Sequence, residues 1–126
     1  MNWASVMSGV LVGYWLSNAS ERRKTLRAHQ REIRVIQADY KPSRHLDAVV
    51  QLDEWWSLAI DDYGRFKRGR LDKLRARLRA IQAPIPEYDV NCESEFTEEK
   101  GARYDQQLKE TRERAMEIFE RFIATL

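Results

Sequence analysis

Apolar positions along this chain follow two patterns, one near the start and another over the rest of the sequence. The first 20 residues contain no charged side chain, and charge begins abruptly at Glu21. After that point, apolar residues recur at alternating steps of three and four, the spacing that places them on one face of an α-helix. The pattern therefore predicts an all-α chain that opens with an uncharged segment.

Four helical ranges follow from the apolar stripes and from the residues that interrupt them. Pro42, Gly64, Pro84 and Pro86 mark the interruptions, because proline excludes a helix interior and pushes the preceding residue out of the α region. Ser43 is well placed to cap the second range. Each range has a narrow apolar face, so we expect one domain, residues 21–126, folded as an antiparallel bundle of three to four helices. The predicted helices cover residues 21–40, 44–63, 65–82 and 97–125.

The uncharged opening segment has the length of a membrane-spanning helix, since 20 residues at ~1.5 Å each span about 30 Å. Trp3 lies near one end of it, and Tyr14 and Trp15 lie near the other, where aromatic rings prefer the bilayer interface. Basic residues follow the segment and none precedes it. By the positive-inside bias, this predicts an N-terminus outside the cell and a bundle in the cytoplasm. We therefore expect residues 1–20 to form a single-pass anchor in the inner membrane that continues into the first bundle helix.

Two alternatives to an anchor stay open. The segment is only moderately apolar because serines and glycines dilute it, and so short an apolar helix can also be buried by other chains in an assembly. A cleaved export signal would need a basic leading region, which is missing. Small residues recur every four positions, a spacing that lets two membrane helices approach closely. The predicted helix-pairing face consists of Ser5, Gly9, Gly13 and Ser17.

Charge balance and titratable residues argue against nucleic-acid binding and catalysis. The 22 basic and 20 acidic side chains leave a net charge of +2, far below the excess typical of a nucleic-acid binder. His29 and His45 stand alone without a partner at metal-ligand spacing, and Cys92 has acidic neighbours that disfavour a reactive thiolate. The sequence contains no phosphate-binding glycine loop, metalloprotease motif or nucleophile elbow. We therefore expect no enzyme activity, no cofactor and no metal.

The densest charge lies in residues 65–79, where eight side chains are Lys or Arg and one is acidic. Three roles stay open for this segment: contact with lipid headgroups, contact with nucleic-acid phosphates, or pairing with the acidic face of the second and fourth helices. If the second helix returns along the first, the segment lies beside the basic flank of the anchor. The predicted contacts with anionic lipid or an acidic partner are Arg22, Arg23, Lys24, Arg65, Lys67, Arg68 and Arg70.

Three pairs of adjacent residues on the second helix raise the question of what faces solvent. Trp55 and Trp56 point about 100° apart, so both cannot fill one narrow core. We expect Trp56 in the core and Trp55 half-exposed, as an anchor for a protein partner. The acidic pairs 53–54 and 61–62 diverge in the same way, which favours a solvated face over a cation site.

These features predict a non-enzymatic interaction or assembly protein that is anchored in the membrane. Its coiled, helical bundle would self-associate or hold a protein partner at the cytoplasmic membrane face, in contact with the anionic lipid surface. Two other functions stay open. One is a membrane-active effector of a phage or an anti-phage system that oligomerises in the bilayer. The other is a subunit of a larger complex that buries the apolar segment.

Overall fold

The computed structural model of this chain describes residues 3–85 and 98–126, with side-chain surroundings for residues 18–85 and 101–126. These residues form helices and short connections, with no strand among them. The predicted all-α class and the helical bundle are therefore confirmed. The described helices are α1 (Trp3–Ala38), η1 (Pro42–Arg44), α2 (His45–Ala59), η2 (Ile60–Asp62), α3 (Arg65–Ala80) and α4 (Glu98–Thr125).

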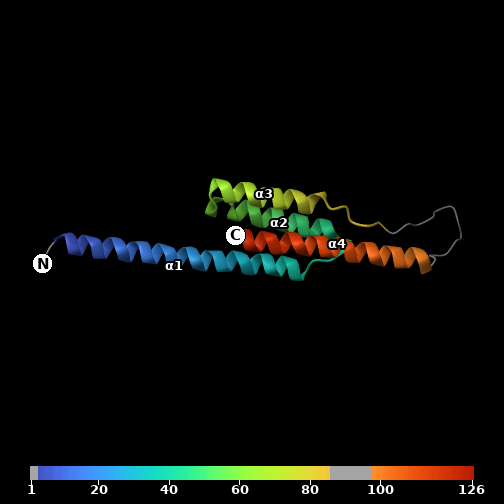
Figure 1. Ribbon diagram of the computed structural model, residues 1–126, viewed down its shortest axis with the longest axis horizontal. Coiled ribbons are helices and arrows are strands. Elements are labelled where there is room, and N and C mark those ends of the chain that lie inside the picture. Colours follow the sequence, from blue (N-terminus) through green and yellow to red (C-terminus); the bar gives the residue numbers. More distant parts are fainter. Residues whose placement is uncertain (1–2, 86–97) are drawn as a thin grey trace.

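The four α-helices lie along one long axis and alternate in direction (Figure 1). Helices α1 and α3 run one way, and α2 and α4 run the other way. Both α1 and α3 contact α2 and α4, so α1 and α3 are diagonal neighbours around a common core. This is the arrangement expected when short turns join helices that each expose one apolar face.

Helix α1 is a single helix of 36 residues that crosses the predicted boundary between anchor and bundle without interruption. Its C-terminal part packs in the bundle from Leu26 onward, and its N-terminal part extends beyond the other helices (Figure 1). We name residues 3–25 the arm.

Among the described residues, no helix combines the length and the apolar character needed to cross a membrane. The predicted membrane-spanning helix over residues 1–20 therefore has no support in the described helices. Serines and glycines lower the mean hydropathy of this segment, although its length would suffice.

The turn between α1 and α2 is built around Pro42. Lys41 is extended, with φ −129° and ψ 128°, as the residue before a proline must be. Pro42 then begins η1, where its missing N–H costs nothing. The expected cap at Ser43 is wrong, because Ser43 lies inside η1 and Arg44 takes the N-cap position of α2 without a side-chain bond.

The turn between α2 and α3 brings the chain back to the end of the bundle from which the arm extends (Figure 1). Tyr63 and Gly64 are both extended, with ψ values of 140° and 165°. The Gly64 carbonyl then accepts the backbone N–H of Arg68 at 2.9 Å, which closes the first turn of α3. Residues 44–82 thus form two antiparallel helices, and the basic start of α3 lies at the arm end.

The core lies between all four α-helices and is rich in aromatic residues. Each helix supplies residues at the three-and-four spacing of its apolar stripe. Ile33 of α1, Leu52 of α2, Leu71 of α3 and Phe119 of α4 are among the side chains buried most completely. Such burial contributes roughly 1.5–3 kcal/mol for each large apolar side chain.

Two glycines near the start of α3 predict stability changes of opposite sign. Gly69 lies inside the helix, and a Cβ added there would meet no other atom, so Gly69→Ala is expected to raise the free energy of unfolding by about 0.5–1 kcal/mol. Gly64 is the N-cap, where alanine is disfavoured, so Gly64→Ala is expected to lower this free energy by roughly 0.5–1 kcal/mol. Urea unfolding of both variants measures the difference. Shifts in the same direction would contradict this assignment of the α3 start.

Candidate functional site

The turn end of the α1–α2 hairpin contains a buried histidine between two helices. His45 Nδ1 lies 2.8 Å from the Tyr40 hydroxyl, and His45 Nε2 lies 2.8 Å from the Leu78 carbonyl oxygen. A carbonyl can only accept, so Nε2 carries the proton and donates it, and Nδ1 of the neutral ring accepts from the Tyr40 O–H. Burial raises the pKa of Tyr40 to about 12. This chain of bonds joins the end of α1, the start of α2 and the end of α3.

A second histidine–tyrosine pair lies at the other end of the hairpin. His29 Nδ1 is 2.7 Å from the Tyr63 hydroxyl, and His29 Nε2 is 3.3 Å from an Asp62 carboxylate oxygen. Burial raises the pKa of Tyr63 to about 12, with added contributions from the negative charges of Asp62 and Glu32. In the tautomer that carries its proton on Nε2, the His29 ring donates to Asp62 and accepts the Tyr63 O–H at Nδ1.

Both histidines connect different helical segments through hydrogen bonds. The Asp62–His29–Tyr63 arrangement resembles part of a general-base assembly, but a catalytic role also needs an open space for substrate. Neither His29 nor His45 lines the groove between α3 and α4 or the groove beside the α1–α2 turn. Within the same residues, no three His, Cys, Asp or Glu side chains lie close enough to hold a metal ion. Cys92 lies outside the described residues.

Trp55 is buried, and the prediction that it is half-exposed is wrong. Its side chain is 9% exposed, and its indole N–H donates to Glu32 of α1 at 2.6 Å. The ring of Phe122 meets it edge-on with centroids 5.6 Å apart. Trp55 and Trp56 both belong to the buried core, with their ring centroids 6.3 Å apart. Trp55 is therefore not at the surface in this fold, where an anchor for a protein partner would have to lie.

The acidic pairs of α2 and η2 are divided between different partners. Asp53 accepts two bonds from Arg75, at 2.5 and 3.2 Å, and a third from Arg79. Burial would raise the pKa of Asp53, but the hydrogen bonds and charges of both arginines outweigh it and hold the pKa below its ordinary value. Arg75 also lies over the Trp56 ring, 5.5 Å from its centroid. Part of the basic segment therefore binds α2 within the molecule.

Arg68 is used within the chain as well. Its Nε donates to the carbonyl oxygens of Ile60 and Tyr63 at 2.9 and 2.7 Å, and its guanidinium lies 3.7 Å from Asp61. The Ile60 carbonyl, at the start of η2, also accepts the Tyr63 backbone N–H at 3.2 Å, and the Tyr63 carbonyl lies directly after η2. Arg68 therefore stabilises the α2–α3 turn, a role that its place in a basic run did not reveal.

The other predicted contact residues remain on the surface at the arm end of the bundle. Lys67 donates to the Leu126 carbonyl oxygen at 3.0 Å. None of the ion pairs in the described part of the chain involves the exposed residues Arg22, Arg23, Lys24, Arg65 and Arg70. The backbone of Ser5, Gly9, Gly13 and Ser17 belongs to α1, but their side chains lie outside the described part, and so does most of the acidic segment 87–99.

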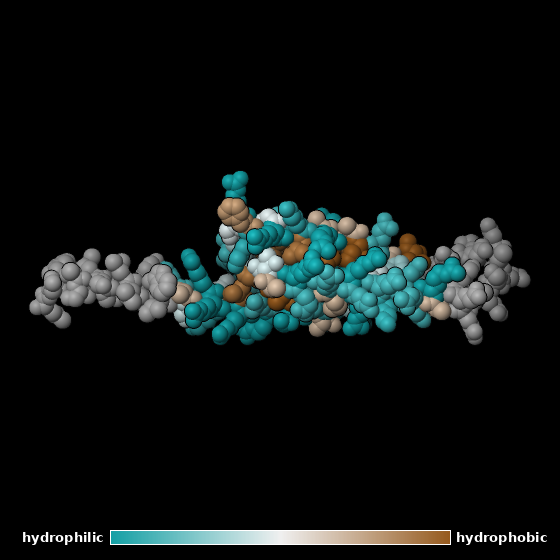
Figure 2. Space-filling model, viewed as in Figure 1, coloured by the Kyte–Doolittle hydropathy of each residue, from teal (hydrophilic) through white to brown (hydrophobic). Residues whose placement is uncertain are grey.

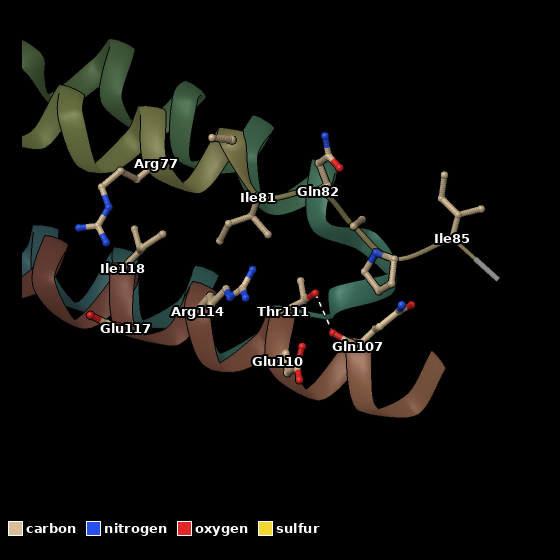
Figure 3. A pocket seen from close by; sticks show the side chains of 13 residues that line it. Arg77, Ile81, Gln82, Ile85, Gln107, Glu110, Thr111, Arg114, Glu117 and Ile118 are labelled. Atoms are coloured by element: carbon tan, nitrogen blue, oxygen red, sulfur yellow. Dashed lines mark hydrogen bonds between the residues drawn. The ribbon is translucent and has the colours of Figure 1, made fainter. Parts of the chain in front are cut away.

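An open groove lies between the end of α3, residues 81–85 and α4 (Figure 3), and the sequence pattern did not predict it. It encloses about 830 Å³, and Ile81 points into it from the α3 side whereas Ile85 points away. Its charged residues alternate in sign, with Arg77 and Arg114 beside Glu110 and Glu117. Thr111, buried at its floor, donates to the Gln107 carbonyl oxygen at 2.8 Å. This mixture favours no particular class of ligand.

The described fold defines the class of this protein as a small all-α protein in which α1 extends beyond the bundle at one end and the start of α4 extends beyond it at the other. No family model, no curated protein and no solved structure matches this chain.

The two buried tyrosines predict a loss of stability at high pH. Their pKa values are raised from 10.0 to about 12, so the unfolded chain ionises first as the pH rises. Their contribution is therefore complete below pH 10 and is lost between pH 10 and about 12. We expect the urea midpoint to fall over this interval, and the fall to be about half as large in Tyr63→Phe.

The double variant Tyr40→Phe/Tyr63→Phe is the control for this measurement, because it removes both phenol groups and keeps every other titratable group. It should be less stable at neutral pH, by roughly 1 kcal/mol for each lost bond, and nearly independent of pH over the same interval. A fall as steep as that of the unmodified chain would contradict the assignment.

Proposed function

We propose that this protein is a non-enzymatic helical interaction protein that binds a second copy of itself through the arm. The observation that supports this is the length of α1, which continues beyond the bundle as one helix (Figure 1). Residues 20–25 are exposed, and packing against the core begins at Leu26. The bundle is thus a rigid base for a helix that no other described helix of the chain accompanies.

The composition of the arm favours a helical partner. An isolated helix in water is marginally stable, and most helix stability in proteins comes from packing of an apolar face. The arm has no charged side chain before Glu21, so an exposed arm would keep apolar residues in water. The small residues at positions 5, 9, 13 and 17 recur once per helical turn, and such a face permits close approach of a second helix. Pairing of two arms would remove apolar surface from water on both chains.

Self-association is tested by enlarging this face. The variant Gly9→Leu/Gly13→Leu should bind its own copies at least roughly tenfold more weakly, because the leucines keep the two backbones apart. A matched control, Ser8→Leu/Asn18→Leu, adds two leucines to other sides of the arm and should leave association unchanged. Sedimentation velocity of the full chain, in buffer and in mild detergent, gives the oligomeric state. A chain that is monomeric in both media would contradict self-association.

A second candidate function places the paired arms in a bilayer, with the bundle on the cytoplasmic face of the inner membrane. The distribution of charge favours it, because exposed Arg22, Arg23 and Lys24 directly follow the uncharged run. A single arm is poorly apolar, but pairing through the small residues would cover the polar face within the membrane.

Membrane insertion predicts that the intact chain stays with membranes after washing at high salt and at alkaline pH. Protease should remove a tag at the N-terminus of intact cells and spare one at the C-terminus. A chain that the washes release would restrict the arm to protein partners. A C-terminal tag that is digested would place the bundle outside and favour a membrane-active, lysis-type role.

A further inference from the structure

The α1–α2 hairpin brings two basic segments that are far apart in sequence to the same end of the molecule. Tyr63, just before α3, is bonded to His29 of α1, so the first turn of α3 lies about one to two helical turns from the base of the arm. Figure 2 shows hydrophilic side chains gathered where α1 leaves the bundle. We name the basic residues at this end the collar: Arg22, Arg23, Lys24, Arg65, Lys67 and Arg70.

The collar residues differ from the other basic residues of α3 in whether they form ion pairs within the molecule. Arg75 and Arg79 are neutralised by Asp53 within the molecule. The collar residues take part in none of the ion pairs among the described side chains. Glu21 and the turn residues Asp61 and Asp62 also lie at this end, where Asp61 contacts Arg68 and Asp62 contacts His29, and the six collar cations outnumber these three acidic side chains. The collar therefore presents a concentrated positive charge to whatever lies beyond this end.

Phe66 adds an apolar group to the same surface. Its side chain is 87% exposed and lies in sequence between Arg65 and Lys67. An exposed aromatic ring flanked by cations suits a bilayer interface, where the ring enters the headgroup–acyl boundary and the cations contact phosphates. A single-stranded nucleic acid would instead be expected to stack on several aromatic side chains in a basic groove.

We propose that the collar and Phe66 form a docking surface for an anionic phospholipid bilayer. Six cations spread over one end of the bundle match a plane of negative headgroups, and Phe66 inserts into that plane. This surface is distinct from the helix-pairing face of the arm, and it rests on the second candidate function, because the arm extends past the collar and must enter the bilayer for the collar to reach the headgroups. The positive end of the molecule then faces the membrane and the far ends of α3 and α4 face away from it.

Vesicle binding of the full chain tests this proposal. The variant Arg23→Gln/Arg65→Gln/Arg70→Gln should bind phosphatidylcholine–phosphatidylglycerol vesicles at least roughly tenfold more weakly than the unmodified chain, with the difference shrinking at high salt. Lys67 is left in place because it bonds Leu126. The matched control, Arg103→Gln/Lys109→Gln/Arg112→Gln, removes the same charge from exposed positions of α4 and should bind as the unmodified chain does.

Two further measurements separate the collar from the arm and from other anionic partners. Binding to pure phosphatidylcholine vesicles reports the arm alone and should be equal in both triple variants. Phe66→Ser, at an exposed site, should keep the thermal unfolding of the bundle but bind anionic vesicles severalfold more weakly. Equal binding of the two triple variants to anionic vesicles would overturn the proposal. A collar variant that loses binding to duplex DNA while keeping vesicle binding would overturn it in favour of a nucleic-acid surface.

Discussion

The register between α1 and α2 is held by one histidine–tyrosine hydrogen bond at each end of their hairpin. His29 meets Tyr63 at 2.7 Å, and Tyr40 meets His45 at 2.8 Å. A slip of one helical turn would move the helices by about 5.4 Å and break both tyrosine–histidine bonds. The same slip would separate Trp55 from Glu32. Everything at the arm end depends on this register, because it fixes which part of α1 lies beside the start of α3.

The sequence pattern predicts the helices well because their ends depend on local chemistry. Pro42 and the Gly64 turn act through backbone geometry, which any fold must respect. Which side of a helix is covered depends instead on the other helices. Leu46 continues the spacing of Val49 and Leu52, yet it is 71% exposed because no helix lies over it. Trp55 is the converse case, since α1 packs over a residue that lies off the main stripe of α2. Neither the exposure of Leu46 nor the burial of Trp55 can be inferred from the sequence of α2 alone.

The sequence alone predicted which residues make up the basic candidate site. It did not predict which of those residues form ion pairs and hydrogen bonds within the molecule. Residues 65–79 read as one basic run, but Arg68 caps a turn, Arg75 and Arg79 bind Asp53, and the residues near the arm stay unpaired. These roles depend on which carbonyls and carboxylates the α2–α3 turn brings within reach, and that is a property of the tertiary structure. The acidic pairs show the same dependence, because Asp53 binds two arginines of α3 whereas Asp61 and Asp62 contact Arg68 and His29.

The absence of any break in α1 between the arm and the core has a geometric consequence. A flexible linker would let the bundle sample many orientations relative to the arm. A continuous helix is a rigid connection, so it fixes both the tilt and the rotation of the bundle relative to the arm. Each residue inserted into such a helix turns the bundle by about 100° and moves it by about 1.5 Å. The number of residues between Gly13 and Leu26 therefore sets the rotation of the bundle about the helix axis relative to the small-residue face of the arm.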